Sequence, residues 1–122
     1  MPRNNRGIFF DISIPVKEVF IKQNIFVAKM AAHVLKTNRV AIVLGRTIYL
    51  HNVSARDFLK NKKWLLHELK HVEQYEQLGF LQFITKYVLF SIKYGYENNP
   101  YELAACAAEQ EEALLSNYRL IY

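Results

Sequence analysis

Two histidines one helical turn apart are the side chains of this 122-residue chain best suited to bind a metal ion. His67 and His71 belong to the run His-Glu-Leu-Lys-His, and side chains four positions apart on a helix share a face, with Cβ atoms about 5–6 Å apart. At that spacing both imidazoles can reach one zinc ion at about 2.0–2.1 Å. Glu68 can reach a zinc-bound water without being a ligand itself, as a general base requires. The motif predicts zinc binding, and the alternative is a solvated helix surface.

A catalytic zinc site usually has three protein ligands, so the histidine pair needs a third partner. The metzincin pattern would place glycine at position 74 and histidine at position 77, but this chain has Gln74 and Gln77. We therefore expect a ligand from a later helix, and Glu102 in its first turn is the best candidate. The alternative is local, because with Asn99 as N-cap Glu102 occupies the capping-box position. The remaining carboxylates of this region lie in an acidic run that is expected to be exposed: Glu109, Glu111 and Glu112.

Other side chains are candidates for supporting roles. Gln74 lies on the side of the two histidines and is expected either to hydrogen-bond a ligand or to be plain helix surface. Tyr49 and His51 share one face of a predicted strand, and either can donate to a transition-state oxyanion, although strand aromatics more often serve packing. Cys106, one turn after Glu102, is expected to be a buried core thiol. The sequence does not rank the rival donors, which are Tyr75, Tyr87, Tyr94, Tyr96 and Tyr101.

Hydrophobic periodicity places these side chains in one α+β domain over residues 1–122. Residues 1–15 are expected to be irregular, and an N-terminal basic helix is expected over about 16–36. A β-hairpin is predicted at about 39–51, with Gly45 first in a type II′ turn. The remaining predictions are a short helix at 55–61, the motif helix at about 62–78, an apolar helix at about 80–94 and the Glu102 helix at about 100–117.

Composition and charge narrow the class of protein. The single cysteine permits no internal disulfide, and we see no signal peptide and no run of about 20 apolar residues, so we expect a cytoplasmic protein. Residues 1–40 hold seven Lys or Arg and two Asp or Glu, whereas residues 41–122 hold nine of each, so the net charge of +5 lies in the first third. A basic helix can attract nucleic acid, but we find no recognition motif and expect no nucleic-acid partner.

Three segments together resemble a known family. These are the run Trp64-Leu-Leu-His-Glu-Leu-Lys-His-Val-Glu-Gln-Tyr75, the hairpin segment Leu44–Leu50 and the later segment Asn99-Pro-Tyr-Glu-Leu-Ala-Ala105. They are similar to minigluzincin-type metallopeptidase domains and to the HExxH domain of bacterial contractile-injection-system core proteins, over about residues 38–110. The resemblance implies a zincin-like fold, zinc on His67, His71 and Glu102, Glu68 as general base, and the hairpin beside the cleft. Thermolysin-type gluzincins often carry an acidic residue four positions after the ligand glutamate, where this chain has Cys106.

The sequence thus favours a zinc-dependent metallopeptidase that acts on a peptide or protein substrate. The alternative is a non-catalytic, zinc-stabilised protein-interaction module descended from such a peptidase. In that case the apolar segment Phe80–Tyr94 is a contact face for a partner protein or a membrane surface.

Overall fold

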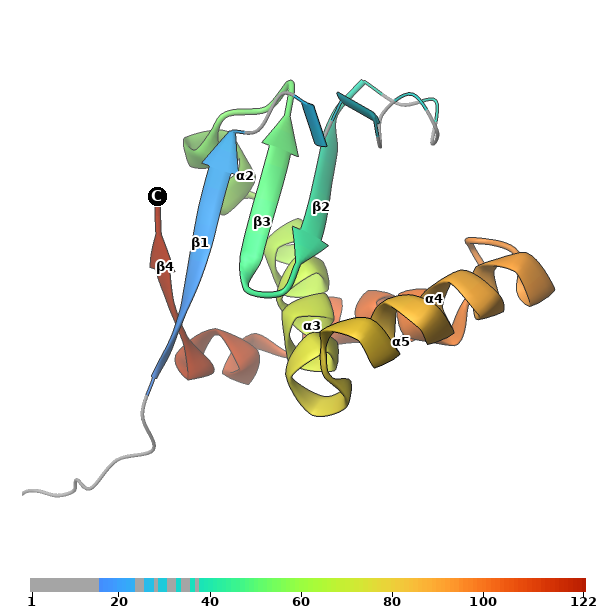
Figure 1. Cartoon of the computed structure of the whole chain (residues 1–122). Coiled ribbons are helices and arrows are strands. Elements are labelled where there is room, and N and C mark those ends of the chain that lie inside the picture. Colours follow the sequence, from blue (N-terminus) through green and yellow to red (C-terminus); the bar gives the residue numbers. More distant parts are fainter. Residues whose placement is uncertain (1–15, 24–25, 28, 31–32, 34–35, 37) are drawn as a thin grey trace, which may run out of the picture.

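A computed structural model describes residues 16–23, 26–27, 29–30, 33, 36 and 38–122. It contains a four-stranded sheet of order β2-β3-β1-β4, formed by β1 (Lys17–Gln23), β2 (Val40–Leu44), β3 (Thr47–His51) and β4 (Tyr118–Ile121). β2 and β3 are antiparallel, and β1 is parallel to both of its neighbours, β3 and β4. β2 and β4 are therefore the edge strands. The predicted α+β class is confirmed (Figure 1).

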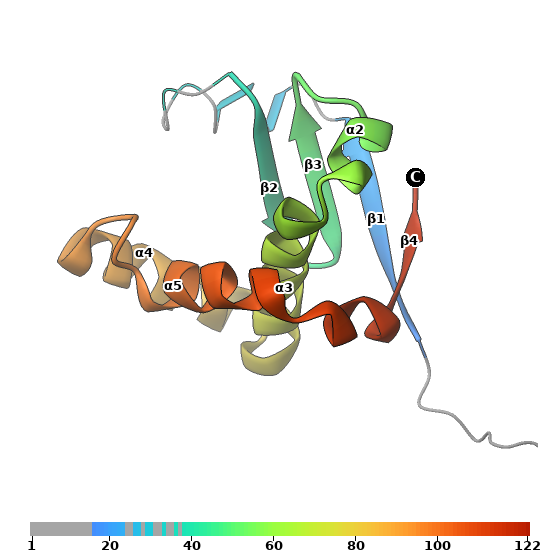
Figure 2. The ribbon, with the colours of Figure 1, turned by 180° about the vertical axis from the view of Figure 1, so that it is seen from behind.

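Helix α3 (Lys62–Leu78), which carries the histidine motif, crosses one face of this sheet (Figures 1 and 2). Its apolar side packs into the core because Leu66, Leu69 and Val72 recur at three-residue spacing and are fully buried. Ile48 and Leu50 of β3 meet them from the sheet. This packing leaves the histidines on a flank of α3 rather than against the sheet.

The hairpin and the helix starts follow the sequence. Gly45 has φ +65°, and Leu44 pairs with Thr47 across a two-residue turn, as predicted for a Gly-first turn. Ser54 caps α2 (Ala55–Lys60) by accepting from the Asp57 amide. The bounds predicted for the motif helix and the apolar helix agree with α3 and α4 (Phe80–Tyr94). Gly79 separates the two helices with φ +85°.

The basic helix predicted over 16–36 is wrong in its first part, because Lys17–Gln23 is a strand. Val19 and Ile21 are buried while their neighbours are more exposed, which is the two-residue alternation of a strand. The helical spacing of the apolar residues concealed this alternation, and pairing with β3 and β4 decided it. Phe26, Val27, Lys29, Met30 and His33 are helical, and residues 1–15 lie outside the described residues.

The last predicted helix, 100–117, is also too long. Helix α5 (Pro100–Ala107) gives way to two 3₁₀ turns, Ala108–Gln110 and Glu112–Asn117, and then to β4. The Tyr118 hydroxyl donates to Glu76 at 2.9 Å and ties β4 to α3. The chain thus leaves the helix in order to add an edge strand, a long-range pairing that local periodicity does not reveal.

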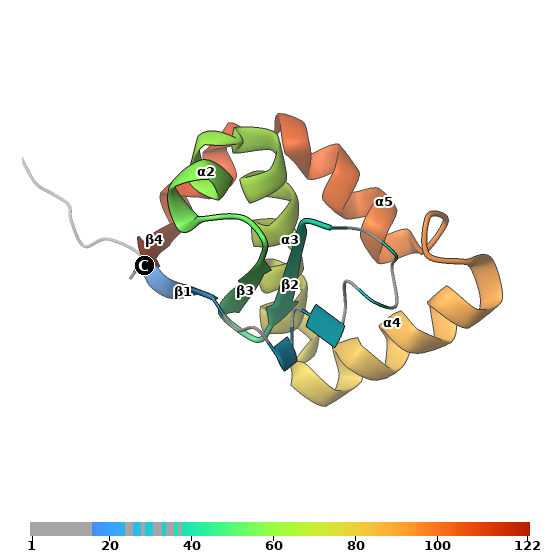
Figure 3. The ribbon, with the colours of Figure 1, turned by 90° about the horizontal axis from the view of Figure 1, so that it is seen from above.

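Helices α4 and α5 lead away from α3 and back again (Figures 1 and 3). Only Phe83 of α4 is buried, and the expectation that this apolar helix offers a contact face stays a prediction. None of the helices in the described part of the chain combines the length and apolar character that a membrane span needs.

Candidate metal centre

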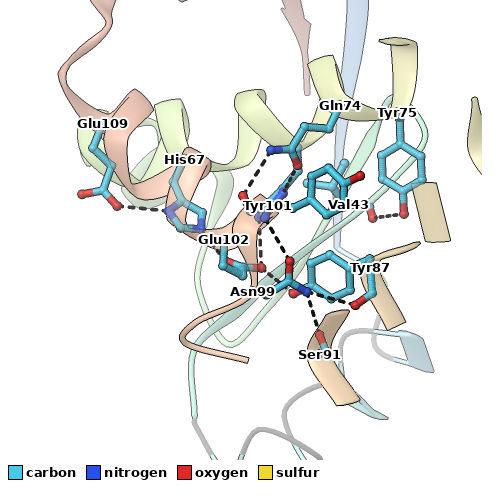
Figure 4. A network of polar contacts seen from close by, with 11 residues as sticks. Val43, His67, Gln74, Tyr75, Tyr87, Ser91, Asn99, Tyr101, Glu102 and Glu109 are labelled. Carbon is cyan, nitrogen blue, oxygen red and sulfur yellow. Dashed lines mark hydrogen bonds and ion pairs between the residues drawn. The ribbon is translucent and has the colours of Figure 1, made fainter. Parts of the chain in front are cut away.

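The side chains of α3 and α5 converge on one carboxylate. His67 Nε2 lies 3.0 Å from Glu102 Oε1, and His71 Nε2 lies 3.2 Å from Glu102 Oε2 (Figure 4). The two imidazole rings stand at 76° with their centroids 5.2 Å apart. Glu102 thus meets His67 and His71, which lie 35 and 31 positions before it in the sequence. These three residues are the predicted zinc ligands. His71 and Glu102 are buried, and the His67 side chain is 15% exposed.

The start of α5 holds Glu102 in place. Asn99 is completely buried and caps α5 by accepting from the Tyr101 amide at 2.9 Å. Its amide group donates to the Tyr87 carbonyl at 2.9 Å and to the Ser91 hydroxyl at 2.8 Å, which joins α5 to α4. The Asn99 N–H bonds to the Tyr96 carbonyl at 3.2 Å, and the Glu102 carboxylate turns toward the histidines. The capping-box alternative for Glu102 is therefore not realised.

Each histidine is also held on its other ring nitrogen. His67 Nδ1 lies 3.0 Å from Glu109 Oε2, and His71 Nδ1 lies 2.9 Å from Gln74 Oε1. Gln74 is fixed in turn by donating to the Tyr101 carbonyl at 3.1 Å. Carboxylate and amide oxygens accept hydrogen bonds, so both Nδ1 atoms carry a proton. Both Nε2 atoms face Glu102, and each can offer its lone pair to a metal once it is deprotonated. Metal-ligating histidines are oriented in this way.

Three acceptors that face one another require a cation or additional protons between them. In the metal-free site, burial alone would lower the pKa of His67, but the hydrogen bond with Glu102 and the nearby Glu68 charge raise this pKa to about 9. For His71 the same opposing causes act, and its pKa is also raised. Burial would raise the pKa of Glu102, but its hydrogen bonds with both histidines hold this pKa well below its usual range. Protons thus supply the positive charge when no metal does.

The donor set fits zinc. Two ligand atoms that are each 2.0–2.1 Å from a tetrahedral zinc lie about 3.3 Å apart, close to the 3.0 and 3.2 Å observed here. The ligand atoms of His67, His71 and Glu102 all lie within 4.8 Å of one another. Two neutral imidazoles and one carboxylate are among the usual ligand sets of catalytic zinc.

Glu68 lies beside this cluster and is 6% exposed. Burial raises the pKa of its carboxyl to about 7, against the opposing effect of the two histidines. A carboxylate with a pKa near neutrality can both take and return a proton at physiological pH.

Two tyrosines approach Glu102 from the α4 side. The Tyr87 hydroxyl donates to Glu102 Oε2. Burial, together with the hydrogen bond to Glu102 and its charge, raises the pKa of Tyr87 well above its usual range, and the same causes act on Tyr96. Both phenols therefore remain protonated donors at neutral pH. Tyr87 donates to Oε2 of this carboxylate, whereas Tyr96, which also interacts with Glu102, is 46% exposed and lines both cavities described below.

Two cavities meet over the cluster. One has a volume of about 780 Å³ and lies between β2 and α4, with apolar walls that include Phe83, Ile84 and Val88. The other has a volume of about 500 Å³ and is bordered by Arg39, Lys63 and Trp64. The residues that line both cavities are Val40, Ala41, His67, Glu68 and Tyr96. The cluster thus sits at the junction of an apolar cavity and a cavity of mixed polar and apolar lining.

The edge strand β2 borders both cavities, which confirms the prediction that the hairpin lies beside the motif helix. Across a two-residue hairpin, Leu44 and Thr47 form a hydrogen-bonded pair, and such pairs alternate along the ladder. Ala41 and Val43 are therefore the β2 residues whose N–H and C=O groups point away from β3. The Val43 carbonyl already accepts from the Tyr75 hydroxyl at 2.9 Å. Ala41 therefore presents the outward backbone groups that no residue of the described ranges pairs with.

One expectation for a supporting residue is wrong, and two of the candidate donors do not lie at the cluster. Tyr49 and His51 line neither cavity and lie on the sheet face opposite Ile48 and Leu50, so the structure does not bring them to the cluster. Cys106 is exposed rather than buried, and partial desolvation with the nearby Glu109 charge raises the pKa of its thiol.

Glu109 is the site residue that sequence reasoning missed. It lies in the acidic run that was expected to be exposed, yet it contacts His67. The family resemblance implies such a contact from the residue four positions after Glu102. One signal was available, since Glu109 follows Glu102 by seven residues, which is two helical turns on the same face. Tyr87 and Tyr96 belonged to a set that the sequence could not rank.

No known protein family, curated protein or solved structure matches the chain. The case for a function accordingly rests on the residues and their geometry.

Proposed function

We propose that this protein is a zinc-dependent metallopeptidase. The observation that carries the proposal is the convergence of His67 Nε2, His71 Nε2 and the Glu102 carboxylate, with the buried Glu68 beside them at the junction of two cavities. A zinc ion bound there would activate a water molecule and polarise a peptide carbonyl.

The protein's own residues divide the remaining work. His67, His71 and Glu102 would hold the metal, with Glu109 and Gln74 fixing the imidazole tautomers. Glu68, which is buried beside the three ligands, would take a proton from the attacking water and deliver it to the leaving amine. Tyr96, a protonated phenol that faces both cavities, is the side chain best placed to donate a hydrogen bond to the developing oxyanion.

The substrate is an extended peptide. Its backbone would pair with Ala41 on the free edge of β2, since main-chain hydrogen bonding to a sheet edge binds extended chains without regard to side-chain identity. The bond from Tyr75 to the Val43 carbonyl limits this pairing at the hairpin end. Large apolar side chains of the substrate would fit the cavity between β2 and α4.

The test is zinc analysis combined with hydrolysis of a mixture of unfolded proteins, for the wild type and Glu68→Gln. We expect about one zinc per chain in both proteins and hydrolysis by the wild type alone, because Glu68 contacts the reacting water and not the metal. A chain that remains metal-free after dialysis against zinc at neutral pH would contradict the metal site. Equal hydrolysis by both proteins would remove Glu68 from the reaction.

A second candidate function is a non-catalytic, zinc-stabilised interaction module. The observation that favours it is the apolar outer face of α4, whose side chains remain exposed in the described structure. Bound zinc without hydrolysis of any unfolded protein would support this candidate over the first.

A further inference from the structure

The outer face of α4 carries a row of exposed apolar side chains, which only the exposed Thr85 interrupts. Leu81 and Ile92 are each 78% exposed, Leu89 is 58% exposed and Val88 is 49% exposed. Positions 81, 88, 89 and 92 follow the helical repeat and therefore lie on one side of the helix. A row of this kind on a 15-residue helix is larger than the isolated apolar side chains of an ordinary surface, and it indicates a contact surface.

The charges of the same segment have one sign. Residues 77–96 contain Lys86 and Lys93 and no aspartate or glutamate. The two lysines are seven positions apart, so they flank the apolar row on one side. Tyr94, at the end of the helix, is 45% exposed, and the Lys93 ammonium lies 5.2 Å from its ring centroid. Apolar side chains bordered by lysines and an amphipathic tyrosine are the composition of a helix that lies in the headgroup region of a bilayer.

No residue of the described ranges covers this face of α4. The helix projects away from the sheet, and its inner side is held to the rest of the protein by Phe83 and by the ring contact between Phe90 and Tyr101, whose centroids are 5.8 Å apart (Figures 1 and 3). Leu81 and Leu89 line neither cavity, whereas Val88 and Ile92 form part of the rim of the apolar cavity. The outer face therefore continues into the mouth of that cavity.

We propose that the outer face of α4, defined by Leu81, Val88, Leu89 and Ile92 with Lys86 and Lys93, binds the surface of an anionic lipid membrane. The apolar row enters the interface and the lysines neutralise lipid headgroups. A helix of this length lies in the plane of the bilayer and does not cross it. The inference does not depend on hydrolysis, and it places the mouth of the apolar cavity next to the lipid surface.

The experiment is co-sedimentation of the full chain with vesicles of phosphatidylcholine, with and without phosphatidylglycerol. We expect binding to the anionic vesicles that weakens as salt is added, and much weaker binding to phosphatidylcholine alone. The double variant Leu81→Glu/Leu89→Glu should bind at least about tenfold more weakly, since two exposed apolar side chains are replaced by charges that the lipid repels. Lys86→Glu and Lys93→Glu should each cost about fivefold or more, on anionic vesicles only.

The matched control is Leu103→Glu, an equivalent change at a side chain of α5 that is 52% exposed. It should bind vesicles like the wild type, and circular dichroism and zinc content should be unchanged in all variants. Failure of the wild type to bind anionic vesicles would overturn the proposal. Equal binding by wild type and Leu81→Glu/Leu89→Glu would do the same. So would a dimer of the wild type that this double variant abolishes, because the face would then join two copies of the chain.

Discussion

The metal cluster and the outer face of α4 depart in opposite ways from the usual distribution of side chains. In the described part of the chain the buried polar residues all belong to the cluster or its frame: Glu68, His71, Gln74, Asn99 and Glu102. On α4 the opposite holds, and leucine and isoleucine side chains point into solvent. Burial of charged groups opposes folding, and apolar groups that stay exposed contribute no hydrophobic stabilisation, so neither arrangement is explained by stability.

The two regions differ in how many of their side chains have interaction partners within the protein. In the cluster, each imidazole has partners on both ring nitrogens, and Glu102 has partners on both oxygens. Within the described residues, the apolar row of α4 has no comparable set of contacts, and its side chains remain exposed. The cluster is thus a compact group of mutually bonded polar side chains, whereas α4 presents an extended apolar surface. Substitutions in the cluster should leave membrane binding unchanged, and substitutions on α4 should leave zinc binding unchanged.

The largest effect is expected from Glu102→Ala. Loss of one of three ligands should weaken zinc binding by orders of magnitude and lower the melting temperature in zinc-containing buffer, because metal binding adds to the folding free energy. Zinc titration and thermal unfolding measure the two effects. Glu111→Ala removes an exposed carboxylate from the same segment, and Leu81→Ser removes an exposed side chain of α4. Both controls should bind zinc like the wild type, and equal affinity for Glu102→Ala would remove Glu102 from the site.

Tyr96→Phe should reduce the rate of peptide hydrolysis by about 10²–10³ while zinc stays bound, since the change removes one donor to the oxyanion. Tyr87→Phe should act differently, because the Tyr87 hydroxyl is committed to Glu102 and its loss weakens zinc binding first. Steady-state kinetics at saturating zinc separates the two variants. The assignment of Tyr96 fails if Tyr96→Phe keeps the full kcat.

Glu109→Gln should weaken zinc binding by about 10–100-fold, as expected for loss of the carboxylate that orients a ligand histidine. Cys106→Ala, at the position where the family resemblance implies such a carboxylate, should leave zinc affinity within a few-fold of the wild type. Competition with a chelator of known affinity measures both variants. A larger effect for Cys106→Ala than for Glu109→Gln would reverse the assignment.

The smallest predicted effect is a difference in pH dependence between the metal-free and the zinc-loaded protein. Because the pKa of His67 is raised from 6.5 to about 9 in the metal-free fold, its contribution to stability is present below pH 6.5 and is lost as the pH rises to about 9. The metal-free protein should therefore become less stable over this range. The zinc-loaded protein should instead lose stability on acidification, as protons compete for the histidines.

Denaturant unfolding at pH 6.5 and pH 9, with a chelator or with zinc, compares how the free energy of unfolding changes with pH in the two forms. A metal-free protein that becomes more stable between these pH values would contradict the arrangement of charges around His67. Leu81→Ser should show the same pH dependence of the unfolding free energy as the wild type in both forms, since Leu81 is not a titratable residue.

Those parts of the fold that depend on local interactions were predictable from the sequence. The bounds of the hairpin and of the helices 62–78 and 80–94 follow from Gly45, Gly79 and hydrophobic periodicity. The pairing of His67 with His71 is likewise local, because a helix fixes the spacing of residues four positions apart. The Asn99-Pro100 start of α5 is recognisable for the same reason.

What the tertiary structure decided was every feature that joins distant segments. Lys17–Gln23 is a strand because it pairs with both β3 and β4, although its apolar spacing also suits a helix. Glu109 reaches His67 because α5 ends at Ala107 and packs along α3. The sequence does not show which side of the sheet α3 covers. It therefore could not show whether Tyr49 and His51 of β3 face the cluster or the opposite side. Periodicity records which side chains of one element share a face, but only packing between elements determines what that face meets.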